Sequence, residues 1–268
     1  MLECVINISE GRDLARVARI AAAAGDAVLD VHSDPHHHRS VLTLLGEDAA
    51  RSVAGAAVAE LDLRTHDGAH PRLGVVDVVP FVALHGSSDD DARAARDAFA
   101  HWFSHVHGVP CFLYGPERSL PEVRRRAFGA LSPDTGPTTS HPTAGATAVG
   151  QRPVLVAYNV WVAGTDLAGV RRLAASVRGP ALRALGLAVG DRWQVSMNLI
   201  EPLALGPPAA FDAVLEAASS AGAVVEGAEL VGLVPDAVLQ AVPRTRWAQL
   251  DLAAERTIEA RLGSRGAR

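Results

Sequence analysis

The densest group of reactive side chains lies in residues 64–77, where His66 and His70 flank an Asp-Gly pair. Gly68 and Pro71 predict a turn here, because glycine adopts unusual backbone angles and proline keeps the residue before it extended. That residue is His70, so its ring is expected to point in a defined direction. An imidazole titrates near neutral pH and suits proton transfer. An exposed polar turn is the alternative interpretation, since loops collect polar residues.

A second histidine-rich segment, residues 32–39, reads HSDPHHHR. A metal site needs three or four ligands directed at one ion, whereas three consecutive histidines project in different directions. His66 and His70 stand at positions i and i+4, but the glycine and proline around them disfavour the helix that would align the two rings. No His-Glu-x-x-His pattern is present. We therefore expect no metal, and a polar turn that lines a site or faces water.

Other common chemistries lack their motifs. The sequence contains no lysine, so a phosphate-binding loop with its Gly-Lys pair cannot occur, and no Gly-x-Ser-x-Gly elbow is present. Arg124, Arg125 and Arg126 form a basic run. This run is typical of a solvated helix face, with attraction for a polyanionic ligand as the alternative.

Composition limits the class and the compartment. The net charge of −5 argues against a generally basic nucleic-acid surface. Cys4 and Cys111 lie in apolar strand-like runs without a Cys-x-x-Cys pair, which fits a reducing compartment. The N-terminus lacks the basic region of a signal peptide, and the apolar runs are too short to span a bilayer. We expect a cytoplasmic protein with no membrane or nucleic-acid partner.

Apolar periodicity predicts strands that alternate with helices, an arrangement that indicates an α/β or α+β fold with helices on at least one face of the sheets. Residues 129–152 are rich in Gly, Pro, Ser and Thr, and a loop of this length is uncommon unless it links domains or binds something. We place a domain boundary at its end. The expected strands are 2–8, 26–32, 39–45, 74–84, 109–114, 153–162, 192–200 and 223–233, and the expected helices are 13–24, 47–63, one from 89, 166–177, 208–221 and 246–262.

Several stretches, taken in order, resemble one family. They are ECVINISEG at 3–11, LDVHSDPHHHRSVLT at 29–43, DGAHPRLGVVDVVPF at 67–81, FLYG at 112–115, GPTTSHPTAGATAVGQRPVLVAYNV at 136–160, QVSMNL at 194–199 and ELVGLVP at 229–235. The chain resembles the formiminotransferase domain of folate-dependent formimidoyltransferases, including the N-terminal half of the bifunctional enzyme that ends histidine degradation. The resemblance implies transfer of a formimidoyl group between an amino acid, in the first place glutamate, and tetrahydrofolate.

The same resemblance implies a fold and an assembly. It implies two α/β subdomains, residues 1–154 and 155–268, each a mixed sheet with helices mainly on one side. A folate-binding tunnel lies between the two subdomains in this family, which also forms homodimers. Tetrahydrofolate serves as cosubstrate, and no metal is expected.

The resemblance also implies roles for particular residues. His70, in the His-Pro-Arg-x-Gly motif, matches the catalytic histidine. From their chemistry, Arg39 and Arg72 are candidates to hold substrate carboxylates, because a guanidinium pairs with a carboxylate through two hydrogen bonds. Asp77 would either orient the site or serve as a structural acid within a strand. The folate-contacting loop matches Gly136, Pro137, Thr138, Thr139, Ser140, His141, Pro142, Thr143, Ala144 and Gly145.

Three positions depart from the family pattern near the expected site. Many relatives have Asp at the position of His32, and Asn at the positions of His38 and Trp161. His32 would replace an obligate acceptor with a group that is neutral or cationic. A different amine acceptor, such as glycine or a secondary-metabolite intermediate, is therefore one alternative, and a non-catalytic folate-binding homologue is another. Because the sequence ends after the transferase-like region, we expect it to lack the fused cyclodeaminase activity.

Overall fold

The computed structural model describes residues 1–264, which form two compact units. The first unit ends at Pro153 and the second begins at Val154. Each unit has its own sheet and its own helices, which confirms the expected α/β class with two subdomains. Within the described part of the chain, no helix has both the length and the apolar character needed to cross a membrane.

The first unit is built on a mixed sheet of six strands in the order β2-β3-β1-β4-β6-β5. Neighbouring strands are antiparallel from β2 to β4, and β6 runs parallel to both β4 and β5. Parallel pairs need a crossover connection, and the helices of this unit supply it. The strands are β1 (Leu2–Ile8), β2 (Val28–Asp34), β3 (Arg39–Leu45), β4 (Val76–Ala83), β5 (Cys111–Tyr114) and β6 (Thr147–Gln151).

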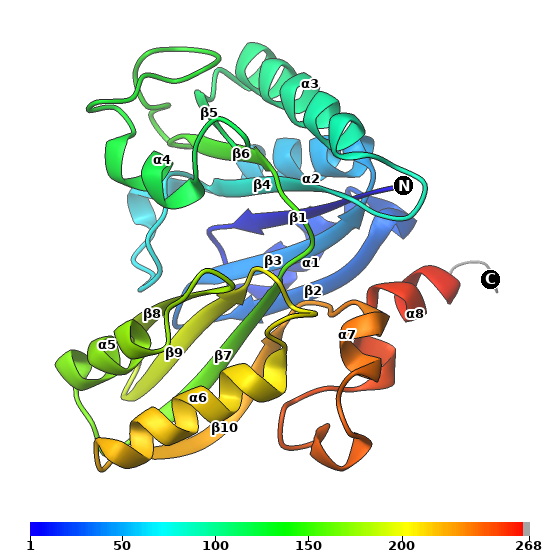
Figure 1. The fold of residues 1–268 in the computed structure, drawn as a ribbon. Helices are drawn as coiled ribbons and strands as arrows, with labels where there is room; N and C mark the ends of the chain where they lie inside the picture. Colours follow the sequence, from blue (N-terminus) through cyan, green and yellow to red (C-terminus); the bar gives the residue numbers. More distant parts are fainter. Residues whose placement is uncertain (265–268) are drawn as a thin grey trace. The chain divides into compact units, whose positions relative to one another are not determined.

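Helices pack on both faces of this sheet, but unequally (Figure 1). The helices α1 (Leu14–Ala22), α2 (Glu47–Glu60) and α3 (Asp89–His107) cover one face, where Val79 and Phe81 of β4 belong to the main core. The short helix α4 (Leu120–Arg126) buries Val123 in a smaller cluster with Val78. Because successive side chains of a strand point to opposite faces, α4 lies on the other face of the sheet.

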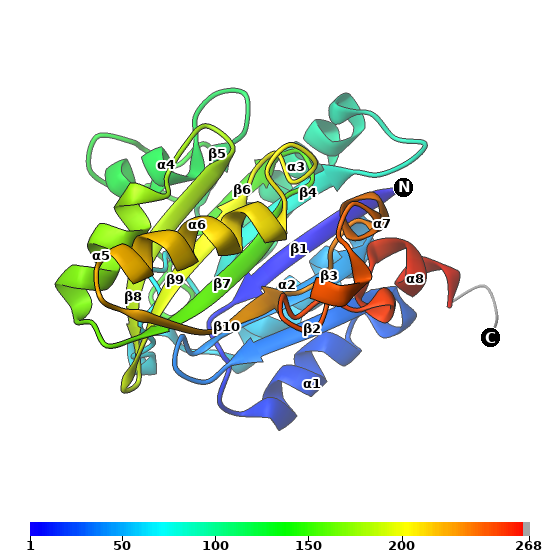
Figure 2. The same cartoon turned by 60° about the horizontal axis from the view of Figure 1, so that its bottom comes forward.

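The second unit contains an antiparallel sheet of four strands in the order β10-β7-β9-β8. The helices α5 (Leu167–Ser176) and α6 (Pro207–Ser220) lie over one face of it, as Figure 2 shows. Tyr158 is buried in this core, and its hydroxyl donates a hydrogen bond of 3.0 Å to the Leu250 carbonyl. The remaining elements are β7 (Val156–Ala163), β8 (Leu182–Val189), β9 (Arg192–Leu199), β10 (Val224–Val231), α7 (Asp236–Gln240) and α8 (Ile258–Gly263).

The expectation of one irregular loop over 129–152 is wrong at its end. Residues Thr147–Gln151 form β6, which is buried between β4 and β5. A strand that is buried on both faces does not alternate polar and apolar residues, so the usual sequence pattern of a strand is absent. At Gly150 a Cβ atom would lie 2.1 Å from Cζ of Tyr114, so the strand needs glycine, a residue that usually signals a loop.

Two further expectations differ from the structure. The strand β8 is not among the strands predicted from the sequence. The helix predicted over 246–262 is also wrong, because α8 covers only its last part. Asp251 has a left-handed backbone with φ of 53°, and its carboxylate accepts a hydrogen bond from the Leu230 backbone and pairs with Arg256. These tertiary contacts stop a helix that apolar spacing alone favours.

Candidate functional site

The two histidine-rich segments pack directly against each other. The His66 ring stacks on the His38 ring with centroids 4.2 Å apart, and Nε2 of His66 donates a hydrogen bond of 2.6 Å to the His38 carbonyl. A Cβ atom at Gly68 would lie 2.2 Å from the carbonyl oxygen of His37, so only glycine fits at this contact. The turn after β2 and the segment before β4 therefore form one surface.

Glu10 follows the end of β1 by two residues and stabilises this surface through hydrogen bonds. Its buried carboxylate accepts hydrogen bonds from the backbone N–H groups of Gly11, Arg12 and Asp13. A ring nitrogen of His38, Nε2, lies 3.0 Å from the same oxygen. Burial alone raises the pKa of Glu10, but the backbone N–H groups of Arg12 and Asp13 and the His38 ring outweigh it and lower the pKa. Glu10 therefore remains a carboxylate and fixes the turn.

His70 adopts a defined tautomer. Its Nδ1 lies 2.8 Å from the carbonyl oxygen of Pro71. A carbonyl oxygen can only accept, so Nδ1 carries the hydrogen and Nε2 carries the lone pair. The ring of His37 meets the His70 ring edge-on, with centroids 5.9 Å apart. The segment thus presents the basic nitrogen of one oriented imidazole, which is the group that proton transfer requires.

Asp77 on β4 is the centre of an ionic network beside His70, and its side chain is fully buried. Its carboxylate accepts a hydrogen bond of 2.6 Å from the Leu73 backbone, and it pairs with Arg39 at 2.5 Å and with Arg124 at 2.7 Å. Burial alone raises the pKa of Asp77, but the two guanidinium groups outweigh it and lower the pKa well below the ordinary value. Asp77 is therefore a structural carboxylate that holds two cations in place.

The surroundings of His70 favour its neutral form. Burial is the largest cause and the guanidinium groups of Arg39 and Arg124 add to it, so that the pKa of His70 falls from 6.5 to about 3. The Asp77 carboxylate and the Pro71 carbonyl act in the opposite direction without reversing the shift. At neutral pH the ring is therefore uncharged and able to accept a proton.

Of two other predicted residues, Arg72 lies near this network, whereas His32 lies on the edge strand β2. Arg72 donates from Nη2 to the Gly68 carbonyl, while its buried Nε has no hydrogen-bond partner among residues 1–264. His32 lies on β2 opposite Val41 of β3. The guanidinium of Arg39 is bound to Asp77, whereas the Nε of Arg72 is buried without a hydrogen-bond partner among the described residues.

The loop of residues 136–145 has two parts with different surroundings. Residues 136–140 are exposed. The second part is attached to the segment that follows His70, because the Ala144 carbonyl accepts a hydrogen bond of 2.9 Å from Val75 and Gly145 forms a bridge with Gly74. The predicted proton shuttle and the end of the predicted folate loop are therefore parts of one connected structure.

His141 stabilises the bend within this loop. Its backbone N–H donates a hydrogen bond of 2.9 Å to the Gly145 carbonyl, and its Nδ1 accepts one of 2.9 Å from the Ala144 N–H. The Leu63 backbone N–H donates 2.7 Å to the Thr143 carbonyl from outside the loop. His141 therefore has a structural role in holding the loop, in addition to any contact with a ligand.

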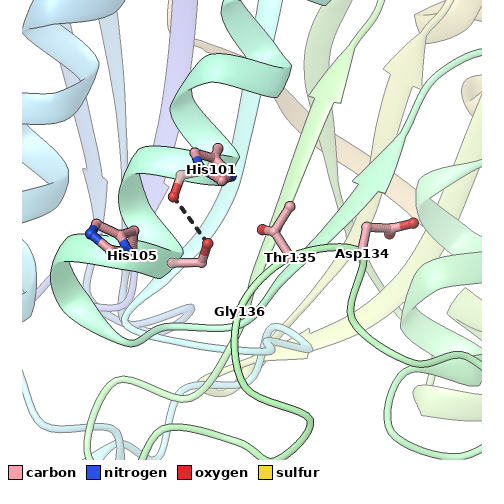
Figure 3. Close-up of a pocket in the computed structure, with 6 residues that line it drawn as sticks. His101, His105, Asp134, Thr135 and Gly136 are labelled. Atoms are coloured by element: carbon pink, nitrogen blue, oxygen red, sulfur yellow. Dashed lines mark hydrogen bonds between the residues drawn. The ribbon is translucent and has the colours of Figure 1, made fainter.

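A hollow of about 430 Å³ lies where this loop begins (Figure 3). The α3 helix forms one wall, where Ser104 Oγ donates 3.1 Å to the His101 carbonyl. Thr135 forms the other wall and donates from Oγ1 to the Ala100 carbonyl, also at 3.1 Å. Across residues 1–264, no group of three or more His, Cys, Asp or Glu side chains is arranged to hold a metal ion. The lining residues of the hollow are His101, Ser104, His105, Asp134, Thr135 and Gly136.

Comparison with known proteins shows to which family this chain belongs. Residues 1–152 match the family model described as the formiminotransferase domain, N-terminal subdomain. A protein of Streptococcus pyogenes serotype M1 named glutamate formimidoyltransferase is 34% identical over 266 residues, which cover 88% of this chain and 89% of that protein. The chain belongs to the formiminotransferase family. This confirms the resemblance drawn from the sequence motifs.

Other relatives extend the formiminotransferase assignment beyond bacteria. The glutamate formimidoyltransferase of Thermoplasma acidophilum is 34% identical and covers 89% of both chains. The formimidoyltransferase-cyclodeaminase of Sus scrofa is 31% identical over 88% of this chain, which spans 50% of that longer protein.

The sequence predicts part of this candidate site and misses part of it. The sequence motifs indicate His70, Arg39 and Asp77, and the structure brings these three residues into one network. Arg124 is not separable by sequence from the two arginines that follow it, yet it alone of the three is bonded to Asp77. Glu10 is also missed, since its role depends on backbone N–H groups that no side-chain motif reveals.

Replacement of Gly145 with alanine is expected to lower the free energy of unfolding by about 2–5 kcal/mol. Gly145 has a φ of 75°, and its Cβ would lie 2.3 Å from the Leu73 carbonyl oxygen. The left-handed backbone costs about 1–2 kcal/mol and the overlap about 1–3 kcal/mol more. Urea denaturation measures the loss.

Gly86→Ala is the matched control for this change. Gly86 has a φ of 83°, but no heavy atom of the described residues lies within 4 Å of the position that an added Cβ would take. This variant is expected to show only the backbone cost of about 1–2 kcal/mol. Equal losses in the two variants would mean that the loop end is not closely packed on the His70 segment.

The neutral state of His70 predicts how stability changes with pH. The unfolded chain binds a proton at this ring near pH 6.5, whereas the folded chain does so only near pH 3. Between these values the unfolded chain binds more protons, so stability contributed by His70 is present above about pH 6.5 and is lost as pH falls. In His70→Gln, which keeps an N–H donor but does not titrate, acidification from about pH 7.5 to about pH 5 should cost less stability. Urea midpoints at both pH values decide this, and identical losses in the two proteins contradict it.

Proposed function

We propose that this chain transfers a formimidoyl group between glutamate and tetrahydrofolate. The observation that carries the proposal is similarity over most of the chain to two proteins named glutamate formimidoyltransferase. The site supports it, because His70 presents an uncharged ring with a lone pair on Nε2. A group of this kind can take a proton from one amine and return it to another.

The chemistry needs one proton relay and no redox step. The formimidoyl carbon is an amidinium-like electrophile, and the amine of tetrahydrofolate attacks it to give a tetrahedral intermediate. The attacking nitrogen then loses a proton to Nε2 of His70. The same proton passes to the glutamate nitrogen as its bond to carbon breaks, so glutamate leaves as an amine. His70 is regenerated in its starting state.

The cations beside His70 suit anionic substrates. In the protein without substrate, burial lowers the pKa of His70 most, and the charges of Arg39 and Arg124 lower it further. Substrate carboxylates bound near these guanidinium groups would offset their charge and raise the pKa of His70 toward the range of an effective base. Arg39 and Arg72 are the candidates to bind such a carboxylate, because a guanidinium pairs with a carboxylate through two hydrogen bonds.

Tetrahydrofolate is assigned to the loop of residues 136–145 as a cosubstrate. The second part of this loop, residues 141–145, is attached to Gly74 and Val75. These two residues follow His70 by four and five positions, so the loop is connected to the segment that carries the proton shuttle. The chemistry above places no demand on a metal ion. Calorimetry with tetrahydrofolate, before and after treatment with a chelator, is expected to give the same affinity. Binding that disappears with chelator and returns with zinc would contradict metal-free recognition.

An amine-acceptor screen tests the proposed substrate. The protein is incubated with 5-formimidoyltetrahydrofolate and single amines, and formimidoyl products are identified by mass spectrometry. Glutamate is expected to be the preferred acceptor. Preference for glycine or another amine would retain the reaction type and replace the substrate. If none of the amines is converted but the protein binds folate tightly, the result would instead indicate a folate-binding homologue without catalytic activity.

The assembly and the compartment are part of the proposal. Family membership supports a homodimer, which sedimentation analysis tests. The two cysteines, Cys4 and Cys111, are buried thiols, and this supports a reducing compartment such as the cytoplasm.

A further inference from the structure

The three consecutive arginines of α4 have different surroundings. Arg124 points into the ionic network, where Nη2 lies 2.7 Å from Oδ2 of Asp77. Arg125 is exposed, and Arg126 pairs with Glu122 one turn earlier on the same helix. A helical pair of this kind at the surface contributes little. Arg124 is therefore the member of the run that reaches the site, and Arg125 is its natural control.

Arg124 also reaches the carbonyl group that orients the proton shuttle. Its Nη1 donates a hydrogen bond of 2.9 Å to the Pro71 carbonyl oxygen. The same oxygen accepts the hydrogen bond of 2.8 Å from Nδ1 of His70. One guanidinium thus joins the buried carboxylate of Asp77 to the carbonyl that receives the His70 proton. Two donors on one carbonyl oxygen use both of its lone pairs and fix its direction.

We propose that Arg124 is a positioning residue for the transfer reaction, because it holds the Pro71 carbonyl and so keeps His70 in the tautomer with its lone pair on Nε2. Which ring nitrogen of a histidine carries the proton is set by the hydrogen bond that the other nitrogen makes. The proposed effect on the reaction rests on the function proposed above. The link from Arg124 to the tautomer of His70 does not.

The charges around His70 give a second consequence. The groups that face its ring are the guanidinium groups of Arg39 and Arg124, the Asp77 carboxylate and the ring of His37. The Arg124 charge lowers the pKa of His70, so its removal should raise that pKa. A residue with a merely structural role would change neither the tautomer nor the pKa of this ring.

Nuclear magnetic resonance on the protein labelled with ¹⁵N-histidine tests the link directly. Two-bond correlations report the tautomer of each ring, and the His70 signal is assigned by its loss in His70→Gln. Wild-type protein and Arg125→Gln are expected to show hydrogen on Nδ1 of His70. Arg124→Gln is expected to shift His70 toward the other tautomer and to raise its pKa. Arg124→Lys, which keeps the charge, should leave the pKa closer to that of the wild type.

Kinetics supply the functional readout. In Arg124→Gln we expect kcat to fall at least tenfold, less than the about 10²–10⁴-fold that loss of the general acid–base group itself costs. KM should change less than kcat, and the acid limb of the pH profile should shift to higher pH. Urea denaturation establishes that the variant is folded under assay conditions, as expected with Arg39 still paired to Asp77.

The two proposals fail in different ways. An unchanged His70 tautomer and pKa in Arg124→Gln overturn the present inference, even if His70→Ala is inactive. A changed tautomer in Arg124→Gln, combined with full activity of His70→Ala, upholds the link from Arg124 to His70 and overturns the catalytic role of His70. A change of equal size in Arg125→Gln also overturns the inference, because that side chain does not contact Pro71 or Asp77.

Discussion

Replacement of His70 with alanine is expected to lower kcat by about 10²–10⁴-fold, the usual contribution of general acid–base catalysis. The change removes the ring whose Nε2 carries the lone pair while leaving the backbone of Pro71 in place. Affinity for tetrahydrofolate should change little, because the backbone N–H groups of Leu63 and Val75 hold Thr143 and Ala144 of the predicted folate loop without help from this side chain. Steady-state kinetics and calorimetry on the same preparation measure both quantities.

Two other histidines serve as controls for this prediction. His85→Ala removes an exposed ring beyond the far end of β4 and should leave kcat unchanged. His66→Ala removes a ring that stacks on His38 and donates to its carbonyl, so we expect lower stability without loss of the proton relay. An inactive but folded His66→Ala beside an active His70→Ala would show that the roles belong to the other ring.

Replacement of Asp77 with asparagine is expected to lower the free energy of unfolding by about 3–5 kcal/mol, as is usual when one partner of a buried ion pair is removed. The amide oxygen can still accept the Leu73 hydrogen bond, but the amide NH2 that replaces Oδ2 cannot accept from Arg39 or Arg124, so the change removes the charge and these two hydrogen bonds. Arg39 and Arg124 would then share a buried site without a counter-ion. Urea denaturation at neutral pH measures the loss.

Asp90→Asn is the matched control for the buried carboxylate. Asp90 pairs with Arg93 on α3, but its side chain is 83% exposed, and exposed pairs contribute little to stability. The stability of this variant should stay close to that of the wild type. Similar losses in the two variants would contradict the assignment of Asp77 as the buried centre of the network.

The sequence predicts most of the strands that carry the site, but it does not predict the contacts between them. Apolar alternation predicts the strands near 2–8 and 39–45, and the Pro71 motif predicts an oriented His70. The strand β6 escapes detection, because its small and apolar residues are buried on both faces and Gly150 resembles a loop residue. Strand patterns depend on a difference between the two faces, and a central parallel strand has none.

The site could not be predicted in full from the sequence, because it depends on contacts between segments that are distant in the chain. The stacking of His38 on His66 joins segments that sequence analysis treated as separate clusters. Arg124 is recognised only once α4 is known to pack on the face of the sheet opposite the main helices. Composition alone predicts that residues 129–152 link domains or bind a ligand, but it does not show that hydrogen bonds fix residues 141–145.

Transfer of a labelled carbon tests the central claim most directly. Purified protein is mixed with tetrahydrofolate and N-formimidoylglutamate carrying ¹³C at the formimidoyl carbon, and the label is followed by mass spectrometry. We predict that the label appears on tetrahydrofolate while one glutamate is released for each labelled folate formed. Label that stays on glutamate, in a sample shown by calorimetry to bind tetrahydrofolate, would contradict the proposed reaction.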